Sequence, residues 1–279
     1  MVGKVRYYMI EVLHLFPKLN SSLIGVLEGL TTAQWNCSTL CKKYTVKDIA
    51  AHLLDTALRK ISAGRDGYLQ TATDIDVYGN MLDFFDGLNA DWVRTYKRIS
   101  PQVLTYQIAW AQDEYYKYLL TLDLSETAMF PVSWAGGKQS KQWFDIAREY
   151  TRRWHHQQQI RQAVGAVTIL QREFYYPFLD ICMQVLPFHY NSEASFAGAL
   201  VKVNVVGDSG GSWSIVKRNH GWEFTDQVSE AEAQVYIDQN IAWMLFSKGI
   251  DIFEAEQYWQ VTGNYDLGAH ALKMNGFIL

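Results

Sequence analysis

The sequence predicts two architectures in succession: a four-helix-type bundle over residues 1–187 and a small α+β domain over residues 188–279. Through the first part, apolar residues recur at helical spacing in long segments that short polar loops connect. From "LPFHYNSEAS" (186–195) onward, short segments alternate polar and apolar residues between glycine-rich turns. The first pattern is typical of packed helices, and the second is typical of a sheet with a few helices.

The helices of the first part are expected at 9–30, 45–61, 78–98, 101–121, 140–166 and 171–187, with a short turn into Trp35. The helix at 45–61 begins at Thr45 as N-cap, and Asp48 three positions later completes a weak capping box. Its apolar residues run at helical spacing from Val46 to Ile61 without a gap.

The second part is expected to hold strands at 199–206, 213–217, 222–225, 233–238 and 258–263, and helices at 240–249 and 266–276. The first three strands predict a β-meander. Between two of them lies Gly-Asp-Ser-Gly-Gly (207–211), a run that also surrounds the nucleophile of trypsin-like serine proteases. Those enzymes need two β-barrels, which this pattern does not predict, so Ser209 is expected to be a turn residue.

Composition excludes several classes of protein. The 279 residues carry a net charge of -4, and the lysines and arginines are scattered, which argues against nucleic-acid binding. No segment approaches the ~20 apolar residues of a membrane span, and Glu11 and His14 interrupt the apolar N-terminus where a signal peptide would be continuous. Three cysteines are too few for a disulfide framework, so we expect reduced, structural thiols in a cytoplasmic protein.

His52 is the first candidate for chemistry. At ~100° per residue it falls on the polar side of its helix, together with Asp48 one turn before and Asp55 one turn after. Either carboxylate could orient the imidazole. The alternative is a histidine on a solvated surface.

A second candidate group lies in "REYTRRWHHQQQIRQA" (148–163). Glu149, Arg152 and His156 share one side of the predicted helix, and His155 flanks the apolar stripe. These polar side chains either line a wet pocket or form a surface ladder in which Glu149 pairs with an arginine. Both interpretations stay open. The expected buried stripe of this helix comprises Trp143, Ile146, Ala147, Tyr150 and Trp154.

Two motifs carry a family resemblance. "LNSSLIGVLEGLTTAQWNCST" with "YTVKDIAAHLLD", which includes His52, resembles the opening of the DinB superfamily, and more closely its thiol-dependent maleylpyruvate isomerase branch. "HQQQI" (156–160) is similar to the late His-x-x-Gln segment of that superfamily. The C-terminal part, including "VTGNYDLGAHAL", resembles the sterol-carrier-protein-like domain that those isomerases append.

The resemblance implies a DinB-like bundle that holds a divalent metal, zinc or nickel, through three side chains and an open water position. His52 and His156 match two of the ligands. Arg152 stands where the family places a third ligand, which leaves Glu149 or His155 as the candidate. A low-molecular-weight thiol and a small-molecule substrate are implied as well, and no oligomeric state is predicted.

The sequence therefore supports two functional hypotheses. In the first, the protein is a metal-dependent, thiol-using transferase or isomerase, with His52 and Arg152 as catalytic residues. Arg152 or Lys248 would receive a substrate carboxylate. In the second, it is a non-catalytic protein that has lost the metal site and binds an anion or an apolar acid, because Arg152 brings a positive charge to a ligand position.

Overall fold

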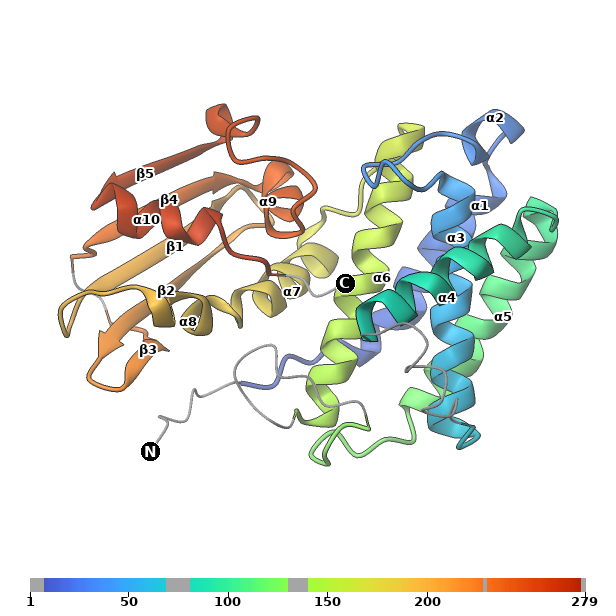
Figure 1. Ribbon diagram of the computed structural model, residues 1–279, viewed down its shortest axis with the longest axis horizontal. Helices are drawn as coiled ribbons and strands as arrows, with labels where there is room; N and C mark the ends of the chain where they lie inside the picture. The colour runs from blue at the N-terminus through green and yellow to red at the C-terminus, as the bar shows by residue number, and fades with distance from the viewer. Residues whose placement is uncertain (1–7, 69–80, 130–139, 228–229, 277–279) are drawn as a thin grey trace. The chain divides into compact units, whose positions relative to one another are not determined.

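The computed structural model describes residues 8–68, 81–129, 140–227 and 230–276, with the backbone alone for 81–86 (Figure 1). The chain divides into two compact units. The helical unit comprises Leu13–Asp123 and Arg153–Thr168, and the sheet unit comprises Met1–Val12, Leu124–Arg152 and Ile169–Leu279. Both units contain helices, so this division does not follow the change from helix to strand, and the predicted boundary at 187/188 stays a prediction.

The helical unit confirms the predicted bundle. α3 packs against α4 and α5, and α1 packs against α5 (Figure 1). Apolar side chains of these helices form the core, for example Leu23, Leu53 and Ile108. The elements are a 3-10 turn Leu13–Leu15, α1 Phe16–Glu28, α2 Thr32–Trp35, α3 Val46–Lys60, a π-turn Ile61–Arg65, α4 Met81–Tyr96, α5 Pro101–Leu119 and the C-terminal part of α6 Gln142–Val164.

Side-chain caps fix where the helices of this unit begin. Thr45 accepts from the backbone N–H of Asp48, while the Asp48 carboxylate accepts from the backbone N–H of Thr45 at 3.0 Å. The predicted capping box is therefore formed in full. Thr31 and Gln34 form a second box at α2, and Ser100 caps α5. Each cap satisfies backbone donors that the first turn of a helix leaves without partners.

The sheet unit contains a five-stranded sheet of order β3-β2-β1-β4-β5. β1, β2 and β3 are antiparallel neighbours, as the predicted meander requires, and β1 pairs with β4 in parallel. The strands are β1 Leu200–Val206, β2 Gly211–Arg218, β3 Gly221–Phe224, β4 Ala233–Asp238 and β5 Trp259–Gly263.

Helices of the sheet unit pack on its strands. α10 (Tyr265–Leu272) contacts β1, β4 and β5, and α9 (Gln239–Phe246) contacts β1 and β4. The single helix predicted at 171–187 is instead two helices, α7 (Arg172–Met183) and α8 (Leu186–His189). Pro187 has no N–H to donate to the carbonyl of Met183 and lies in the first turn of α8, where a proline is well accommodated.

Ser209 lies in the turn between β1 and β2, as predicted. Its backbone N–H donates to Gln239 Oε1 at 2.9 Å, and Arg172 Nη1 donates to the carbonyl of Gly210 at 2.7 Å. Gly207 has φ 137°, and a Cβ there would lie 2.3 Å from the Gln239 side chain. These contacts hold the glycine-rich run as a structural turn.

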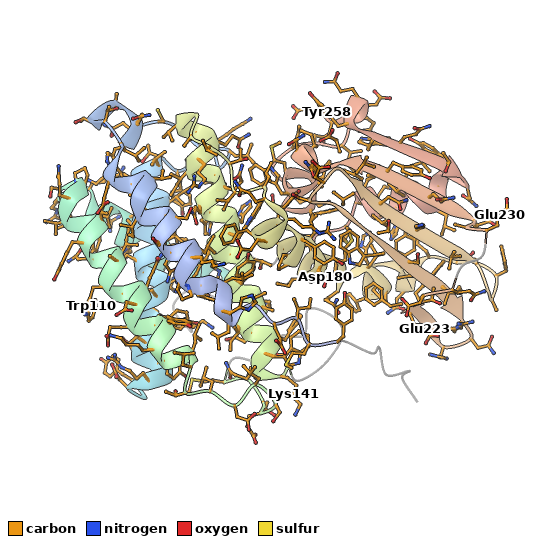
Figure 2. All side chains as sticks on the ribbon, turned by 180° about the vertical axis from the view of Figure 1, so that it is seen from behind. Trp110, Lys141, Asp180, Glu223, Glu230 and Tyr258 are labelled. Carbon is orange, nitrogen blue, oxygen red and sulfur yellow. The ribbon has the colours of Figure 1, made fainter. Side chains whose placement is uncertain are left out.

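Asp180 is a buried carboxylate inside the sheet unit (Figure 2). It accepts from the indole of Trp213 at 2.7 Å and from the hydroxyl of Tyr8. Burial raises the pKa of Tyr8, and the hydrogen bond to Asp180 and its charge act in the same direction. Tyr176, one turn before Asp180, stacks on Trp213 with 5.8 Å between ring centroids. The cluster joins the N-terminal segment, α7 and β2.

Within the part of the chain that the structure describes, no helix combines the length and the apolar character that crossing a bilayer requires.

Candidate functional site

α3 brings His52 into a largely buried environment. The side of α3 predicted to be polar is not solvated, because Asp48, Asp55 and Thr56 are each less than a tenth exposed and His52 is half-buried. His52 itself therefore lies between a fully solvated and a fully buried histidine. Asp48 serves the helix cap, and Asp55 pairs with Arg59 at 2.8 Å. Burial raises the pKa of Asp55, and Arg59 opposes that shift.

α6 is buried on almost every side. The predicted stripe is confirmed for Ile146, Ala147, Tyr150 and Trp154, while Trp143 is half-buried. The polar residues from Glu149 to Arg161, which lie all around the helix, are less than a tenth exposed apart from Arg152. Those residues are Glu149 at 3%, Thr151 at 3%, Arg153 at 4%, His155 at 3%, His156 at 8%, Gln157 at 1%, Gln158 at 2%, Gln159 at 5% and Arg161 at 6%.

Glu149 and Arg152 form the ion pair predicted on α6, but the pair does not lie on an exposed surface. Arg152 Nη1 lies 3.9 Å from Glu149 Oε2, and the Glu149 side chain is only 2% exposed. Further along the helix, Arg153 donates to Asn20 Oδ1 at 3.0 Å. Arg161 donates to Ser22 Oγ at 2.6 Å. Partners on α1 thus allow Arg153 and Arg161 to lie buried inside the helical unit.

The structure brings His52 and His156 together within the helical unit. Their ring centroids are 5.0 Å apart, and the ring planes meet at 82°. His155 lies 5.5 Å from His156, centroid to centroid. Burial lowers the pKa of His155 well below its ordinary value, and the neighbouring His156 lowers it further. The two imidazoles from α3 and α6 are close enough to contact one small group at the same time.

Gln159 was not among the predicted site residues, yet it contacts one of them. Its Oε1 lies 3.0 Å from Nδ1 of His156, and both side chains are buried. The sequence carried a signal for this contact, because positions i and i+3 of a helix are neighbours on its surface.

The described side chains do not form a group of three ligands for the predicted metal site. Among the residues that the structure describes, no three His, Cys, Asp or Glu side chains are grouped so that they could hold a metal ion. A catalytic zinc site takes three protein ligands. Glu149 or His155 as the third ligand therefore stays a prediction, and Arg152 occupies the position one turn before His156.

Lys248, the other candidate for a substrate carboxylate, is engaged at the end of α10. Its Nζ donates to the carbonyl of Lys273 at 2.8 Å. Burial lowers the pKa of Lys248. These contacts give Lys248 a structural role in the sheet unit.

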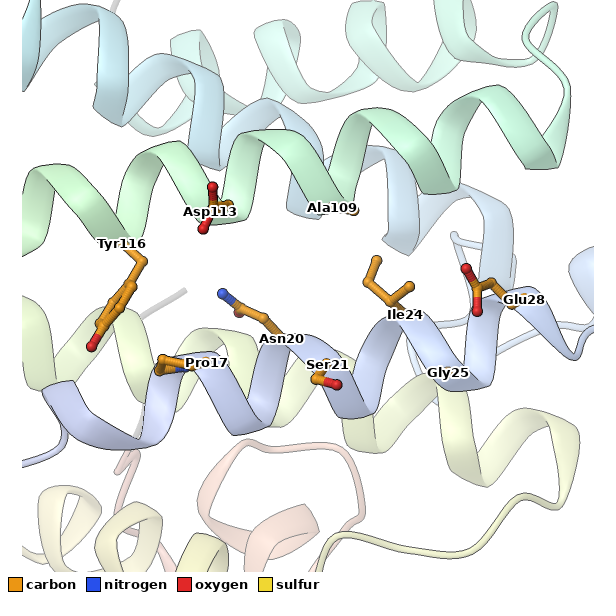
Figure 3. Close-up of a pocket in the computed structure, with 9 residues that line it drawn as sticks. All are labelled: Pro17, Asn20, Ser21, Ile24, Gly25, Glu28, Ala109, Asp113 and Tyr116. Atoms are coloured by element: carbon orange, nitrogen blue, oxygen red, sulfur yellow. The ribbon is translucent and has the colours of Figure 1, made fainter.

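A groove between α1 and α5 has no histidine among its lining residues (Figure 3). Its cavity volume is about 410 Å³, within the range of sites for small molecules. Two of its polar side chains have partners, since Asp113 pairs with Lys117 at 2.8 Å and Asn20 accepts from Arg153. The lining comprises Pro17, Asn20, Ser21, Ile24, Gly25, Glu28, Ala109, Asp113 and Tyr116.

Comparisons with known proteins point to one family. Residues 17–161, more than half of the chain, match the profile described as the mycothiol maleylpyruvate isomerase N-terminal domain. The structure is similar to a crystal structure of a His-to-Ala mutant of a mycothiol-dependent maleylpyruvate isomerase, with a TM-score of 0.53 and 11% identity over 92% of this chain and 93% of that chain. A second crystal structure of such an isomerase gives a TM-score of 0.52 and 12% identity over 86% of this chain and 88% of that one. At this identity the similarity concerns the fold. No curated protein sequence matches the chain.

Proposed function

Because the chain belongs to the mycothiol maleylpyruvate isomerase N-terminal domain family, we propose that it is a thiol-using isomerase or transferase acting on a small molecule at His52 and His156. The observation that supports this proposal is the 5.0 Å separation of the two rings, which come from different helices. Imidazole changes its charge nearest to neutral pH, so a histidine pair is suited to proton transfer.

The chemistry needs a base and an acid beside the thiol. A low-molecular-weight thiol such as mycothiol reacts as its thiolate, so its proton must be removed before it adds to the substrate. One imidazole of the pair takes that proton and returns it when the thiol leaves, which regenerates both the thiol and the histidine. On α6, one turn before His156, Arg152 supplies a positive charge for a substrate carboxylate, and its side chain is 23% exposed.

In a metal-dependent version of the proposal, His52 and His156 would instead be two ligands of a divalent metal, zinc or nickel, with Glu149 or His155 as the third. Such a metal would lower the pKa of a bound thiol or water. Since the described residues offer no complete set of ligands, no step of the reaction is assigned to the metal. A cytoplasmic location completes the proposal, because all three cysteines are free thiols, as suits a reducing compartment.

Turnover of maleylpyruvate in the presence of mycothiol tests the proposal. The wild-type protein should convert the substrate only when the thiol is present. His52→Ala and His156→Ala should each lower kcat/KM by at least about 10²-fold, the usual contribution of an acid–base group. His14→Ala, at an exposed histidine, is the matched control and should change nothing. Full activity in both site variants would refute the assignment of the site.

A second candidate function is supported by Arg152, which places a cation where the family expects a metal ligand. In this alternative the protein binds an anion or an apolar acid without chemistry. Calorimetry with a carboxylic acid such as maleylpyruvate, without thiol, should then show binding that Arg152→Ala weakens, while no product forms.

A further inference from the structure

Gln159 and His156 make a contact that bears on the protonation of the imidazole. Both residues lie on α6, three positions apart, and Nδ1 of His156 is 3.0 Å from Oε1 of Gln159. An amide oxygen only accepts hydrogen bonds, so the proton of this contact belongs to Nδ1. A neutral imidazole has one N–H, and Nε2 then carries the lone pair.

The surroundings of the contact favour a single arrangement. His156 is 8% exposed and Gln159 is 5% exposed, so water competes little for either group. The i,i+3 spacing on a helix keeps the two side chains beside each other without a long-range constraint. The competing arrangement has the glutamine amide rotated, so that its NH₂ donates to Nδ1 and the ring proton moves to Nε2.

We infer that Gln159 is a positioning residue that holds His156 as the Nδ1–H tautomer. Nε2 is then the nitrogen of His156 that accepts a proton or binds an electrophile. The tautomer assignment depends only on the contact with Gln159. Its consequence for chemistry rests on the proposed function, in which Nε2 serves the reaction at the His52–His156 pair.

Long-range ¹H–¹⁵N correlation spectra of protein labelled with ¹⁵N-histidine test the inference directly. The His156 signals are assigned as those missing from His156→Ala. We expect the chemical shifts of a protonated Nδ1 and an unprotonated Nε2 in the wild-type protein. Signals of a protonated Nε2, or of an even mixture of tautomers, would overturn the inference.

Two variants and a control separate positioning from packing. Gln159→Leu removes the acceptor and should abolish the preference for Nδ1–H, whereas Gln159→Glu keeps an acceptor oxygen and should retain it. Gln162→Leu, at an exposed glutamine of the same helix, should leave the spectrum unchanged. An Nδ1–H preference that persists in Gln159→Leu would contradict the inference. If Gln159→Leu does not fold, the wild-type and Gln159→Glu spectra still show whether His156 is the Nδ1–H tautomer.

The same samples distinguish this inference from the proposed function. A wild-type protein with the Nδ1–H tautomer but without thiol-dependent turnover would refute the function and leave the role of Gln159 intact. An enzyme with thiol-dependent turnover whose His156 is the Nε2–H tautomer would refute the role of Gln159 and leave the proposed function intact.

Discussion

The imidazole of His52 on α3 meets the imidazole of His156 on α6 edge to face, with 5.0 Å between ring centroids and 82° between ring planes. The two residues are far apart in the sequence; His156 is buried and His52 is half-buried. A ligand atom that approaches one ring therefore also approaches the other. This proximity makes the pair one candidate site within the helical unit.

The metal-dependent version of the proposal predicts that Zn²⁺ raises the melting temperature only when both histidines are present. A ligand that binds the folded state stabilises it by RT ln(1 + [L]/Kd), about 2.7 kcal/mol at a hundredfold excess over Kd. Thermal unfolding of the wild-type protein, His52→Ala and His156→Ala with added Zn²⁺ measures this. An equal rise in all three would place the zinc elsewhere, and no rise in the wild type would remove the metal from the proposal.

His189 should make the protein less stable in acid. Burial lowers the pKa of His189 below 6.5; the charges of His270 and Lys248 act in the same direction, while the His270 carbonyl and Glu193 oppose it. The unfolded chain thus takes up the proton more readily, so the contribution of His189 to stability is present above pH 6.5. It is lost as the pH falls from there through the lower pKa of the folded state.

His189→Gln tests this dependence, because glutamine can still donate to the His270 carbonyl, which His189 Nε2 contacts at 2.9 Å. The free energy of unfolding, measured by urea denaturation between about pH 5 and 8, should fall less steeply in this variant than in the wild type. Identical slopes would show that His189 does not contribute.

Thr45→Ala should lower the free energy of unfolding by about 1 kcal/mol, the usual cost of losing an N-cap. The variant removes the hydroxyl that accepts from the backbone of Asp48 at the start of α3. Urea denaturation measures the loss. Thr121→Ala, which removes an exposed hydroxyl bonded to a carbonyl one turn back, is the control and should stay within about 0.5 kcal/mol of the wild type. Equal losses in both variants would argue against the cap.

Asp180→Ala should lower the free energy of unfolding by about 1–3 kcal/mol, because the buried indole N–H of Trp213 and the half-exposed hydroxyl of Tyr8 lose their acceptor. Asp180→Asn keeps an acceptor oxygen and should cost less. Denaturation followed by the fluorescence of the tryptophans compares them. Wild-type stability in Asp180→Ala would contradict the role given to this cluster.

Local signals predicted much of the fold. Thr45 marks a helix start because a hydroxyl in that position can satisfy backbone donors of the first turn. The alternation of polar and apolar residues in 199–225 predicted the meander, because successive side chains of a strand point to opposite faces of a sheet. The parallel pairing of β1 with β4 was not predicted, because it joins strands that are separated by two others in the sequence.

The burial of α6 could not be predicted from its own sequence. Arg153 and Arg161 have the pattern of a solvated face, yet their partners are Asn20 and Ser22 on a helix more than a hundred residues earlier. Likewise, helical spacing alone places Gln159 beside His156, whereas the 5.0 Å approach of His52 to His156 required coordinates. The roles of all these residues in chemistry stay predictions.

A double-mutant cycle on His52 and His156 tests the central claim most directly. The measurement is kcat/KM for thiol-dependent turnover in the wild type, His52→Ala, His156→Ala and the double variant. Residues that act as one unit are strongly non-additive, so the double variant should lose no more activity than either single variant. Losses that multiply, or a double variant as active as the wild type, would contradict a shared site.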